Sequence, residues 1–332
     1  MIGSAPEPLL RVDGLRTWFP IRAGVLQKTV GWVRAVDDVS FEIGPGQTLA
    51  LVGESGCGKT TVGRAILQLE KSQAGRVLFE GTDLCTLSRE ELHPYRRQMQ
   101  IIFQDPMASL DPRMTVRDSI AEGMESFGIG GDGAERVDRV AQLMERVQLD
   151  PKQMSRYPHE FSGGQRQRIC IARALAVEPR LIVCDEATSA LDVSIQAQIL
   201  NLLSDLQDEF GLTYLFITHD LGVVRYLADR VAVMYVGQIV EETSAERIFE
   251  HPEHPYTQGL LAAIPSVDPE RRSVTVRVRG DVASPANPPS GCRFHPRCPK
   301  VFDRCSREEP PPYAVDRGIS RCFLSEGTDG GD

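Results

Sequence analysis

A glycine-rich run carries the clearest chemistry in this sequence. Residues 53–60 are Gly-Glu-Ser-Gly-Cys-Gly-Lys-Thr and fit the pattern G-x-x-x-x-G-K-[ST]. Glycines let a backbone curl until successive N–H groups face one anion. Lys59 would reach the β- and γ-phosphates of a nucleotide, and the hydroxyl of Thr60 would be a ligand of Mg²⁺. The alternative is a glycine turn between a strand and a helix that binds nothing.

A second candidate site follows the apolar run 181–184, where Asp185 and Glu186 stand next to each other. Such a run predicts a buried strand, and in open α/β sheets ligands bind at the carboxyl ends of the strands. Asp185 is then placed to hold Mg²⁺, directly or through water, and Glu186 to activate a water that attacks the γ-phosphate. The alternative is the start of a helix, where acidic residues are favoured in any case.

Residues 161–165, Phe-Ser-Gly-Gly-Gln, predict a second anion-binding device at the start of a helix. The side chain of Ser162 can cap a helix, and the two glycines after it leave backbone N–H groups open to an anion. The alternative is an ordinary helix cap without a ligand.

Four of the eight cysteines cluster near the C-terminal end with the spacing C-x5-C-x6-C-x16-C. In a reducing compartment this pattern favours a metal site over two disulfides. Four thiolates suit a [4Fe–4S] cluster or structural Zn²⁺, although the spacing lacks the short C-x2-C pairs of zinc ribbons. Metal-free thiols are the third alternative. Cys57 is expected to be exposed in the glycine loop, where ATP would shield it. The clustered cysteines are Cys292, Cys298, Cys305 and Cys322.

The elements that must position these residues alternate between strands and helices. The run 48–52 predicts a buried strand before the glycine loop, and residues 61–69 predict a helix after it. This alternation indicates an α/β domain with a mostly parallel core sheet. Residues 20–34 predict a loop or a hairpin insertion. Other strands are predicted at 9–12, 35–43, 75–79, 99–103, 181–184, 213–217, 231–235 and 238–241, and helices at 89–97, 114–126, 135–148, 165–177 and 194–210.

Composition limits the class of protein and divides the chain. The 332 residues are 41% apolar and 25% charged, as in soluble globular proteins. The net charge of −9 argues against a nucleic-acid binder. No apolar run approaches the roughly 18 residues that span a bilayer, and no signal-peptide pattern is visible, so a cytoplasmic location is the default expectation. A change in composition predicts a domain over 1–250, with a helical insertion at about 106–170, and a small C-terminal domain over 251–332.

Together, these motifs resemble those of an ATP-binding cassette (ABC) ATPase over residues 9 to about 250. Phe161 departs from the family pattern, in which leucine is more usual. The resemblance implies a RecA-like core sheet with a β subdomain and an inserted helical subdomain, and two cassettes that close head to tail around ATP. The matching segments are Walker A at 53–61, the Q-loop at 101–106, the signature motif at 162–165, Walker B at 185–186, the D-loop at 189–192 and the switch histidine at 218–220.

The resemblance also implies a role for individual residues. Glu186, His219 and Gln104 would be catalytic, with His219 at the γ-phosphate and Gln104 linking the magnesium site to the helical block. Mg²⁺ would be held by Thr60, Gln104 and Asp185. Phe19, with Trp18 as the second choice, would stack on adenine, and core packing is the alternative for both. The implied nucleotide contacts are Phe19, Gly53, Ser55, Gly56, Cys57, Gly58, Lys59, Thr60 and Thr61 of one subunit, and Ser162, Gly163, Gly164 and Gln165 of the other.

Two later segments narrow the resemblance to the ATPase subunits of oligopeptide and dipeptide importers. They are residues 254–265, which begin His-Pro-Tyr, and residues 291–299, which contain Cys292 and Cys298. The resemblance implies ATP hydrolysis on the cytoplasmic face of the membrane and a [4Fe–4S] cluster on the four cysteines. It implies as partners a second, non-identical ATPase subunit, two membrane permeases and an extracytoplasmic binding protein. Related importers carry nickel, glutathione or other small solutes, which are the alternative substrates.

Two other classes of function compete with transport. A soluble ABC ATPase that acts on DNA or ribosomes often has two cassettes or a long coiled coil, whereas this chain has one cassette, no heptad array and an acidic composition. A redox or iron sensor would use the cysteines as its functional site. The presence of Glu186 and His219 argues against a sensor.

Overall fold

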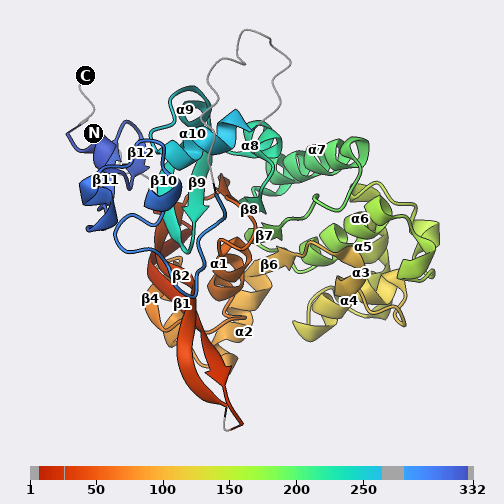
Figure 1. Cartoon of the computed structure of the whole chain (residues 1–332). Coiled ribbons are helices and arrows are strands. Elements are labelled where there is room, and N and C mark those ends of the chain that lie inside the picture. Colours follow the sequence, from red (N-terminus) through yellow and green to blue (C-terminus); the bar gives the residue numbers. More distant parts are fainter. Residues whose placement is uncertain (1–6, 26, 264–279, 328–332) are drawn as a thin grey trace, which may run out of the picture. The chain divides into compact units, whose positions relative to one another are not determined.

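The computed structural model describes residues 7–25, 27–263 and 280–327, which fall into two compact units. The first unit contains the described parts of 1–44, 48–85 and 218–332, and the second contains 45–47 and 86–217. The second unit is the middle of the chain, mostly yellow and green in Figure 1. Strands and helices alternate along both units, so the predicted α/β class is confirmed.

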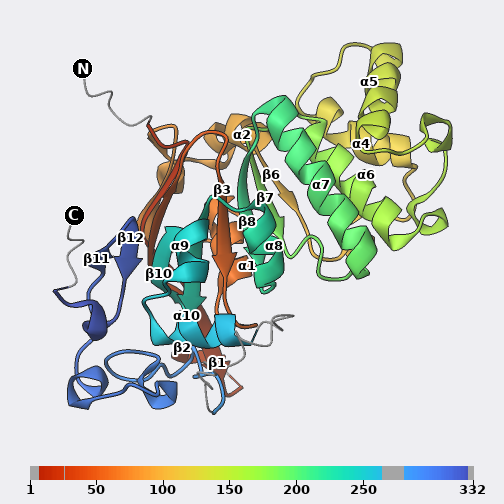
Figure 2. The same ribbon diagram turned by 90° about the horizontal axis from the view of Figure 1, so that it is seen from above.

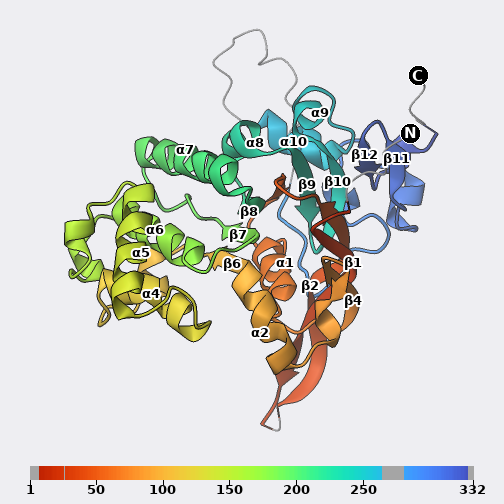
Figure 3. The same cartoon turned by 180° about the vertical axis from the view of Figure 1, so that it is seen from behind.

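An antiparallel sheet of four strands forms part of the first unit. Its order is β2 (Lys28–Ile43), β1 (Leu10–Ala23), β4 (Ala74–Phe79) and β5 (Thr82–Asp83). Strands β1 and β2 form one long hairpin, which extends beyond β4 in Figure 3. Of the two structures predicted for residues 20–34, the hairpin is therefore the correct one. At the start of β1, successive side chains point to opposite faces of the sheet, so that Leu10 and Val12 are buried while Arg11 is exposed.

A second group of strands in the first unit includes the strand that leads into the glycine loop. Strand β3 (Thr48–Val52) is buried throughout and pairs in parallel with β9 (Arg230–Tyr235), which pairs antiparallel with β10 (Gln238–Ser244). A continuous apolar run is what a strand covered on both faces requires. The unit also contains α1 (Lys59–Ile66), α8 (Leu221–Leu227), α9 (Ala245–Glu250) and α10 (Pro255–Ala262). Helix α9 contacts β9 and β10, and Figure 2 shows it beside β10.

The C-terminal residues contribute to the first unit as well. Strand β12 (Gly318–Ser320) extends the sheet from β10, and β11 (Tyr313–Val315) pairs with β12. Phe294 is 1% exposed and packs edge-on against Tyr235, with the ring centroids 5.3 Å apart. This cysteine-bearing segment therefore shares a hydrophobic core with β9 and α10. The domain boundary near residue 250 remains a prediction.

The second unit combines three parallel strands with most of the helices. Strand β7 (Leu181–Asp185) lies between β6 (Met99–Ile102) and β8 (Thr213–Thr218). Helices α4 (Val116–Ser126), α5 (Gly133–Arg146) and α6 (Gly163–Leu175) pack together, as Figure 1 shows. Among the described residues, no helix is both long and apolar enough to cross a membrane. The helices are α2 (Arg89–Gln98), α3 (Pro106–Ser109), α4 (Val116–Ser126), α5 (Gly133–Arg146), α6 (Gly163–Leu175) and α7 (Val193–Phe210).

Buried polar groups fix the start of α10. Glu241 is fully buried, and its carboxylate accepts the backbone N–H groups of Glu253 at 2.8 Å and His254 at 2.9 Å. The Nδ1 atom of buried His254 accepts the N–H of Tyr256 at 3.0 Å and so caps the helix. Burial lowers the pKa of His254 to about 3, so the ring is neutral in the folded chain.

This neutral histidine predicts a pH-dependent loss of stability. Between about pH 6.5 and 3 the unfolded chain binds a proton at His254 that the folded chain does not bind, so stability falls as the pH falls. The His254→Asn variant keeps an acceptor for the cap and does not titrate. Its free energy of unfolding, measured by urea denaturation, should therefore fall less between pH 7 and 5, by up to about 1.4 kcal/mol per pH unit. Exposed His159→Asn is the control, and parallel pH profiles for His254→Asn and the wild type would contradict the assignment.

Candidate functional site

The glycine loop passes through a space without room for side chains. It leaves β3 after Val52 and enters α1 at Lys59. A Cβ atom on Gly53 would overlap the carbonyl oxygen of Met234, and one on Gly58 would overlap the carbonyl oxygen of Ala35. Both glycines also have positive φ angles, 155° and 111°. The glycines at these two positions are therefore required by close backbone contacts as well as by the curl of the loop.

Lys59 lies inside this curl. Its side chain is buried, and Nζ donates to the carbonyl oxygens of Gly53 at 2.7 Å and Glu54 at 3.1 Å. The ammonium group is thus held against the loop, as a phosphate-binding lysine requires. The prediction that Cys57 is exposed is wrong. Its side chain is 1% exposed because it points toward Gly53 and Lys59, and burial raises the pKa of the thiol.

The second unit brings Gln104 and Glu186 together. Parallel pairing of β6 with β7 aligns the ends of these strands. Nε2 of Gln104 donates to the carboxylate of Glu186 at 3.0 Å and lies 3.4 Å from Oγ of Ser189. Asp185 is the last residue of β7 and is 4% exposed. The carboxylates and the amide therefore gather at the carboxyl end of the strand, where ligands of α/β sheets bind.

Glu186 has an unusual backbone conformation. Its φ angle is 49°, and its N–H donates to the carbonyl of Ile217 at 2.9 Å. A non-glycine residue in this region costs about 1–3 kcal/mol and is typical of functional sites. The alternative that Glu186 begins a helix is wrong, because turns follow it and α7 begins only at Val193.

The signature segment begins α6 with a reciprocal cap. The hydroxyl of Ser162 accepts the N–H of Gln165 at 3.3 Å, and the side chain of Gln165 accepts the N–H of Ser162 at 2.9 Å. Ser162 and Gly163 are exposed, whereas Gly164 is buried beside Ile195 of α7. A Cβ atom on Gly164 would lie 2.5 Å from Cγ2 of Ile195, so close packing explains this glycine. The capping is thus observed, and anion binding remains a prediction.

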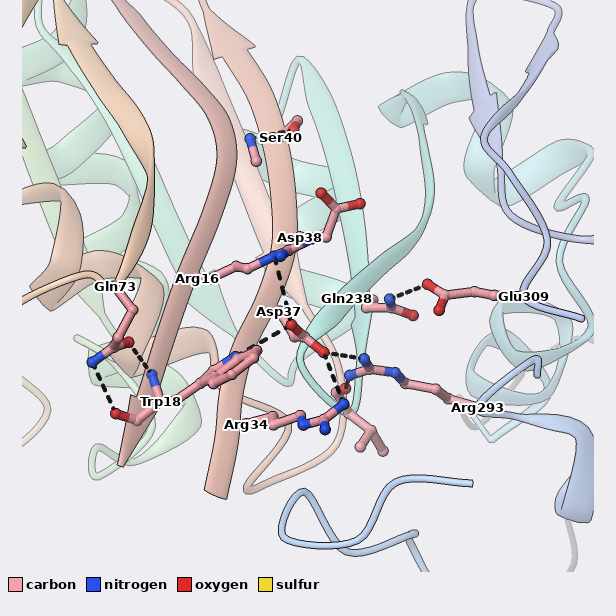
Figure 4. Close-up of polar contacts among 12 residues, drawn as sticks. Arg16, Trp18, Arg34, Asp37, Asp38, Ser40, Gln73, Gln238, Arg293 and Glu309 are labelled. Atoms are coloured by element: carbon pink, nitrogen blue, oxygen red, sulfur yellow. Dashed lines mark hydrogen bonds and ion pairs between the residues drawn. The ribbon is translucent and has the colours of Figure 1, made fainter. Parts of the chain in front are cut away.

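The aromatic candidates for adenine stacking lie on β1. The indole Nε1 of Trp18 donates to Asp37 at 3.2 Å, and the guanidinium of Arg34 lies 5.1 Å from the centroid of the indole ring. Figure 4 shows this contact of Trp18 with Asp37. Phe19 is half-buried opposite Val33. The indole N–H and the ring of Trp18 already have partners in Asp37 and Arg34. Phe19 therefore remains the first choice for stacking on adenine.

The candidate residues divide between the two units. Lys59 and Phe19 belong to the first unit, together with His219, which is exposed directly after β8. Gln104 and Glu186, with Asp185 and residues 162–165, belong to the second. The structure therefore shows each half of the site by itself, and their joint action on one nucleotide remains a prediction.

The four clustered cysteines line one small cavity together with Phe294, Phe302 and Phe323. Burial raises the pKa of Cys292 to about 12 and that of Cys322 to about 11, and neighbouring thiols add to both shifts. Within the described residues, no three His, Cys, Asp or Glu side chains are arranged to hold a metal ion. The cysteines thus converge as the sequence suggested, but neither an iron–sulfur cluster nor a zinc site is shown.

Models of two known protein families match two separate segments of the chain. The family model described as "ABC transporter" matches residues 36–189, and the model described as "Oligopeptide/dipeptide transporter, C-terminal region" matches residues 240–305. These two segments thus correspond to known ABC transporter segments.

Known relatives agree with these matches. The chain is 50% identical to the oligopeptide transport ATP-binding protein AppF of Bacillus subtilis, over 93% of this chain and 95% of that protein. It is 55% identical to the glutathione import ATP-binding protein GsiA of Salmonella choleraesuis, over 84% of this chain and 45% of that protein. The dimeric cassette MJ0796, solved with ADP and phosphate, is 28% identical with a TM-score of 0.64, over 71% of this chain and 98% of that one.

Proposed function

The chain belongs to the ATP-binding subunits of ABC transporters, and from this premise we propose that it hydrolyses ATP to drive the import of oligopeptides or dipeptides. The observation that carries the peptide assignment is the match of residues 240–305 to the oligopeptide/dipeptide transporter region. AppF supports it through its similarity over almost the whole chain. The relative GsiA makes glutathione the second candidate, and nickel or another small solute remains an alternative.

The proposed assembly follows from the same family. The chain acts at the cytoplasmic face of the membrane as a peripheral subunit, without nucleic acid as a partner. It pairs with a second, non-identical ATPase subunit beneath two permeases, which an extracytoplasmic binding protein supplies with substrate. The dimeric structure of the cassette MJ0796 supports the pairing of two ATPase subunits.

In the proposed reaction each residue has one task. Glu186 accepts a proton from the water whose oxygen attacks the γ-phosphorus, and the bond from this phosphorus to the β–γ bridging oxygen breaks as ADP leaves. Lys59 binds the β- and γ-phosphate oxygens, and His219 contacts the γ-phosphate. The hydrogen bond from Gln104 to Glu186 supports this role, because it orients the carboxylate before the nucleotide binds.

Magnesium and the partner subunit complete the proposed site. Asp185, Thr60 and Gln104 fit a Mg²⁺ site because each offers an oxygen donor, and the bound ion would neutralise charge on the phosphate oxygens. The burial of Asp185 at the end of β7 supports its part in this site. Ser162 and Gly163 would cap the nucleotide of the partner subunit, since both are exposed at the N-terminus of α6. Phe19 would stack on the adenine.

The occupant proposed for the cavity of four cysteines is a [4Fe–4S] cluster, with zinc as the alternative. Four cysteines that line one cavity supply the number of thiolates that either centre takes. The role proposed for the cluster is structural, because it would tie Cys322 to Cys298 across a segment with few apolar residues.

The substrate assignment can be tested in proteoliposomes that contain the complete transporter. We expect the binding protein to stimulate phosphate release when it is loaded with a di-, tri- or tetrapeptide, because substrate delivery and hydrolysis are coupled in this family. Glutathione and Ni²⁺ are the matched alternatives in the same assay. Stimulation by either of these, without stimulation by peptides, would replace the peptide assignment.

Substitution of the proposed base tests the chemistry. Glu186→Gln should lower phosphate release about 10²- to 10⁴-fold while ATP binding persists, since only the proton acceptor is lost. The control is Glu178→Gln, which makes the same change at an exposed ion pair with Arg97 and Arg139 in the same unit. Near wild-type turnover of Glu186→Gln in the assembled transporter would remove Glu186 from the catalytic role.

Elemental analysis tests the cysteine cavity. The full chain, purified without oxygen, should contain iron and sulfide, about four of each. Cys298→Ser should lose this content, whereas Cys85→Ser should keep it, because Cys85 lies outside the cavity. One zinc and no iron would establish the zinc alternative, and an ordered C-terminal segment without metal would exclude both.

A further inference from the structure

Each of the four clustered cysteines has an arginine as its neighbour in sequence. Arg293 follows Cys292, and an arginine precedes each of the other three cysteines. Arg304, beside Cys305, pairs with Glu308 and Glu326 within the cysteine segment itself. The other three make contacts with more distant parts of the first unit, and these are Arg293, Arg297 and Arg321.

Arg297 connects the cavity of cysteines directly to the glycine loop. Its guanidinium donates two hydrogen bonds to the carboxylate of Glu54, at 2.6 and 3.0 Å. The side chain of Arg297 is 8% exposed and lies against the ring of Tyr235. The paired hydrogen bonds with Glu54 raise the pKa of the guanidinium, so it is charged at any physiological pH. A bidentate, mostly buried pair of this kind holds its partners in one geometry.

The backbone and the side chain of Glu54 both make hydrogen bonds within the first unit. Its backbone N–H donates to the hydroxyl of Tyr256 at 3.0 Å, and its carbonyl accepts from Lys59 at 3.1 Å. The carboxylate of Glu54 accepts the hydrogen bonds from Arg297. A displacement of Arg297 would therefore move the residue whose carbonyl positions Lys59.

Arg293 reaches the other end of the loop through the backbone. It donates to the carbonyl of Val236. It also donates to the carboxylate of Asp37, as Figure 4 shows. Gly237 follows Val236 in the chain. Its N–H donates to the carbonyl of Cys57 at 2.9 Å, and its carbonyl accepts the N–H of Asp37 at 2.8 Å. Two arginines beside two cysteines thus support the beginning and the end of the glycine loop.

We propose that Arg293 and Arg297 are positioning residues that couple the four-cysteine cavity to the phosphate-binding loop, so that nucleotide binding and the state of the cysteines affect each other. The inference rests on the proposed binding of ATP at this loop. Linkage makes the coupling reciprocal: a change at Cys298 that shifts Arg297 alters nucleotide affinity, and nucleotide alters the accessibility of Cys298 by the same free energy. Arg297 carries the more direct contact and is the residue to test.

Equilibrium binding of a fluorescent ATP analogue to the full chain tests the first half of this coupling. Arg297→Gln should weaken binding about fivefold or more, which is the lower end of typical coupling between sites. Arg304→Gln is the matched control, since it removes the same charge beside another cysteine of the cavity without touching the loop. Glu54→Gln should weaken binding similarly, and adding Arg297→Gln to it should have little further effect.

The second half is tested on the full chain after a chelator has removed any metal from the cysteines and has itself been removed. The measurement is the rate at which a maleimide labels each cysteine, resolved by mass spectrometry of peptides. ATP should change the labelling rate of Cys298 in the wild type and in Arg304→Gln, and this effect should be lost in Arg297→Gln. A merely structural role for Arg297 would change the labelling rate without removing its dependence on ATP. Arg297→Lys keeps the charge and should fall between wild type and Arg297→Gln, which provides a test if the glutamine variant does not fold.

The outcomes separate this inference from the proposed function. A wild-type chain that does not bind ATP defeats the proposed function. A chain that binds ATP, with Arg297→Gln equal to the wild type or no weaker than Arg304→Gln, defeats the coupling alone. Additive effects of Glu54→Gln and Arg297→Gln would also overturn it, because two residues that act through one contact cannot be independent.

Discussion

The close passage of the glycine loop between neighbouring backbones is the constraint on which the nucleotide site depends. Gly53 lies so close to the carbonyl of Met234 on β9 that a Cβ atom would not fit, and Gly58 lies equally close to the carbonyl of Ala35 on β2. The loop is therefore set by the two strands around it as well as by its own curl. The ammonium group of Lys59 is held against the carbonyls of the loop itself, and the proposed binding of phosphate starts from this held position.

The C-terminal segment belongs to the same arrangement. Phe294 fills the core beside Tyr235, and the neighbouring arginines place buried charge next to the carboxylates of Asp37 and Glu54. Removal of one partner from such a pair leaves an uncompensated charge, which is more destabilising than the pair is stabilising. The shared hydrophobic core around Phe294 is therefore the larger source of stability for this small segment, and the ion pairs fix its geometry.

The second unit holds its part of the site in a strained but supported geometry. Glu186 has a left-handed backbone, stabilised by its N–H bond to Ile217 and by the amide of Gln104. Such strain persists only where the neighbouring groups hold the residue in place. Here Ile217 and Gln104 hold Glu186 just after the end of the buried strand β7. The close contact of Gly164 with Ile195 similarly fixes α6 against α7 and thereby the exposed cap at Ser162.

The sequence by itself determined the chemistry and the order of the elements, because phosphate loops, strand-end carboxylates and helix caps depend on residues close together in the chain. It predicted Lys59, Asp185, Glu186 and the α/β class on that local basis. It left the hairpin at residues 20–34 as one of two alternatives, since that choice depends on pairing between strands. Only the tertiary structure decided that Cys57 is buried, that Gly164 serves packing, and that Arg293 and Arg297 reach the loop. Arg297 and Glu54 are 243 residues apart, and no local pattern encodes a contact that only the fold creates.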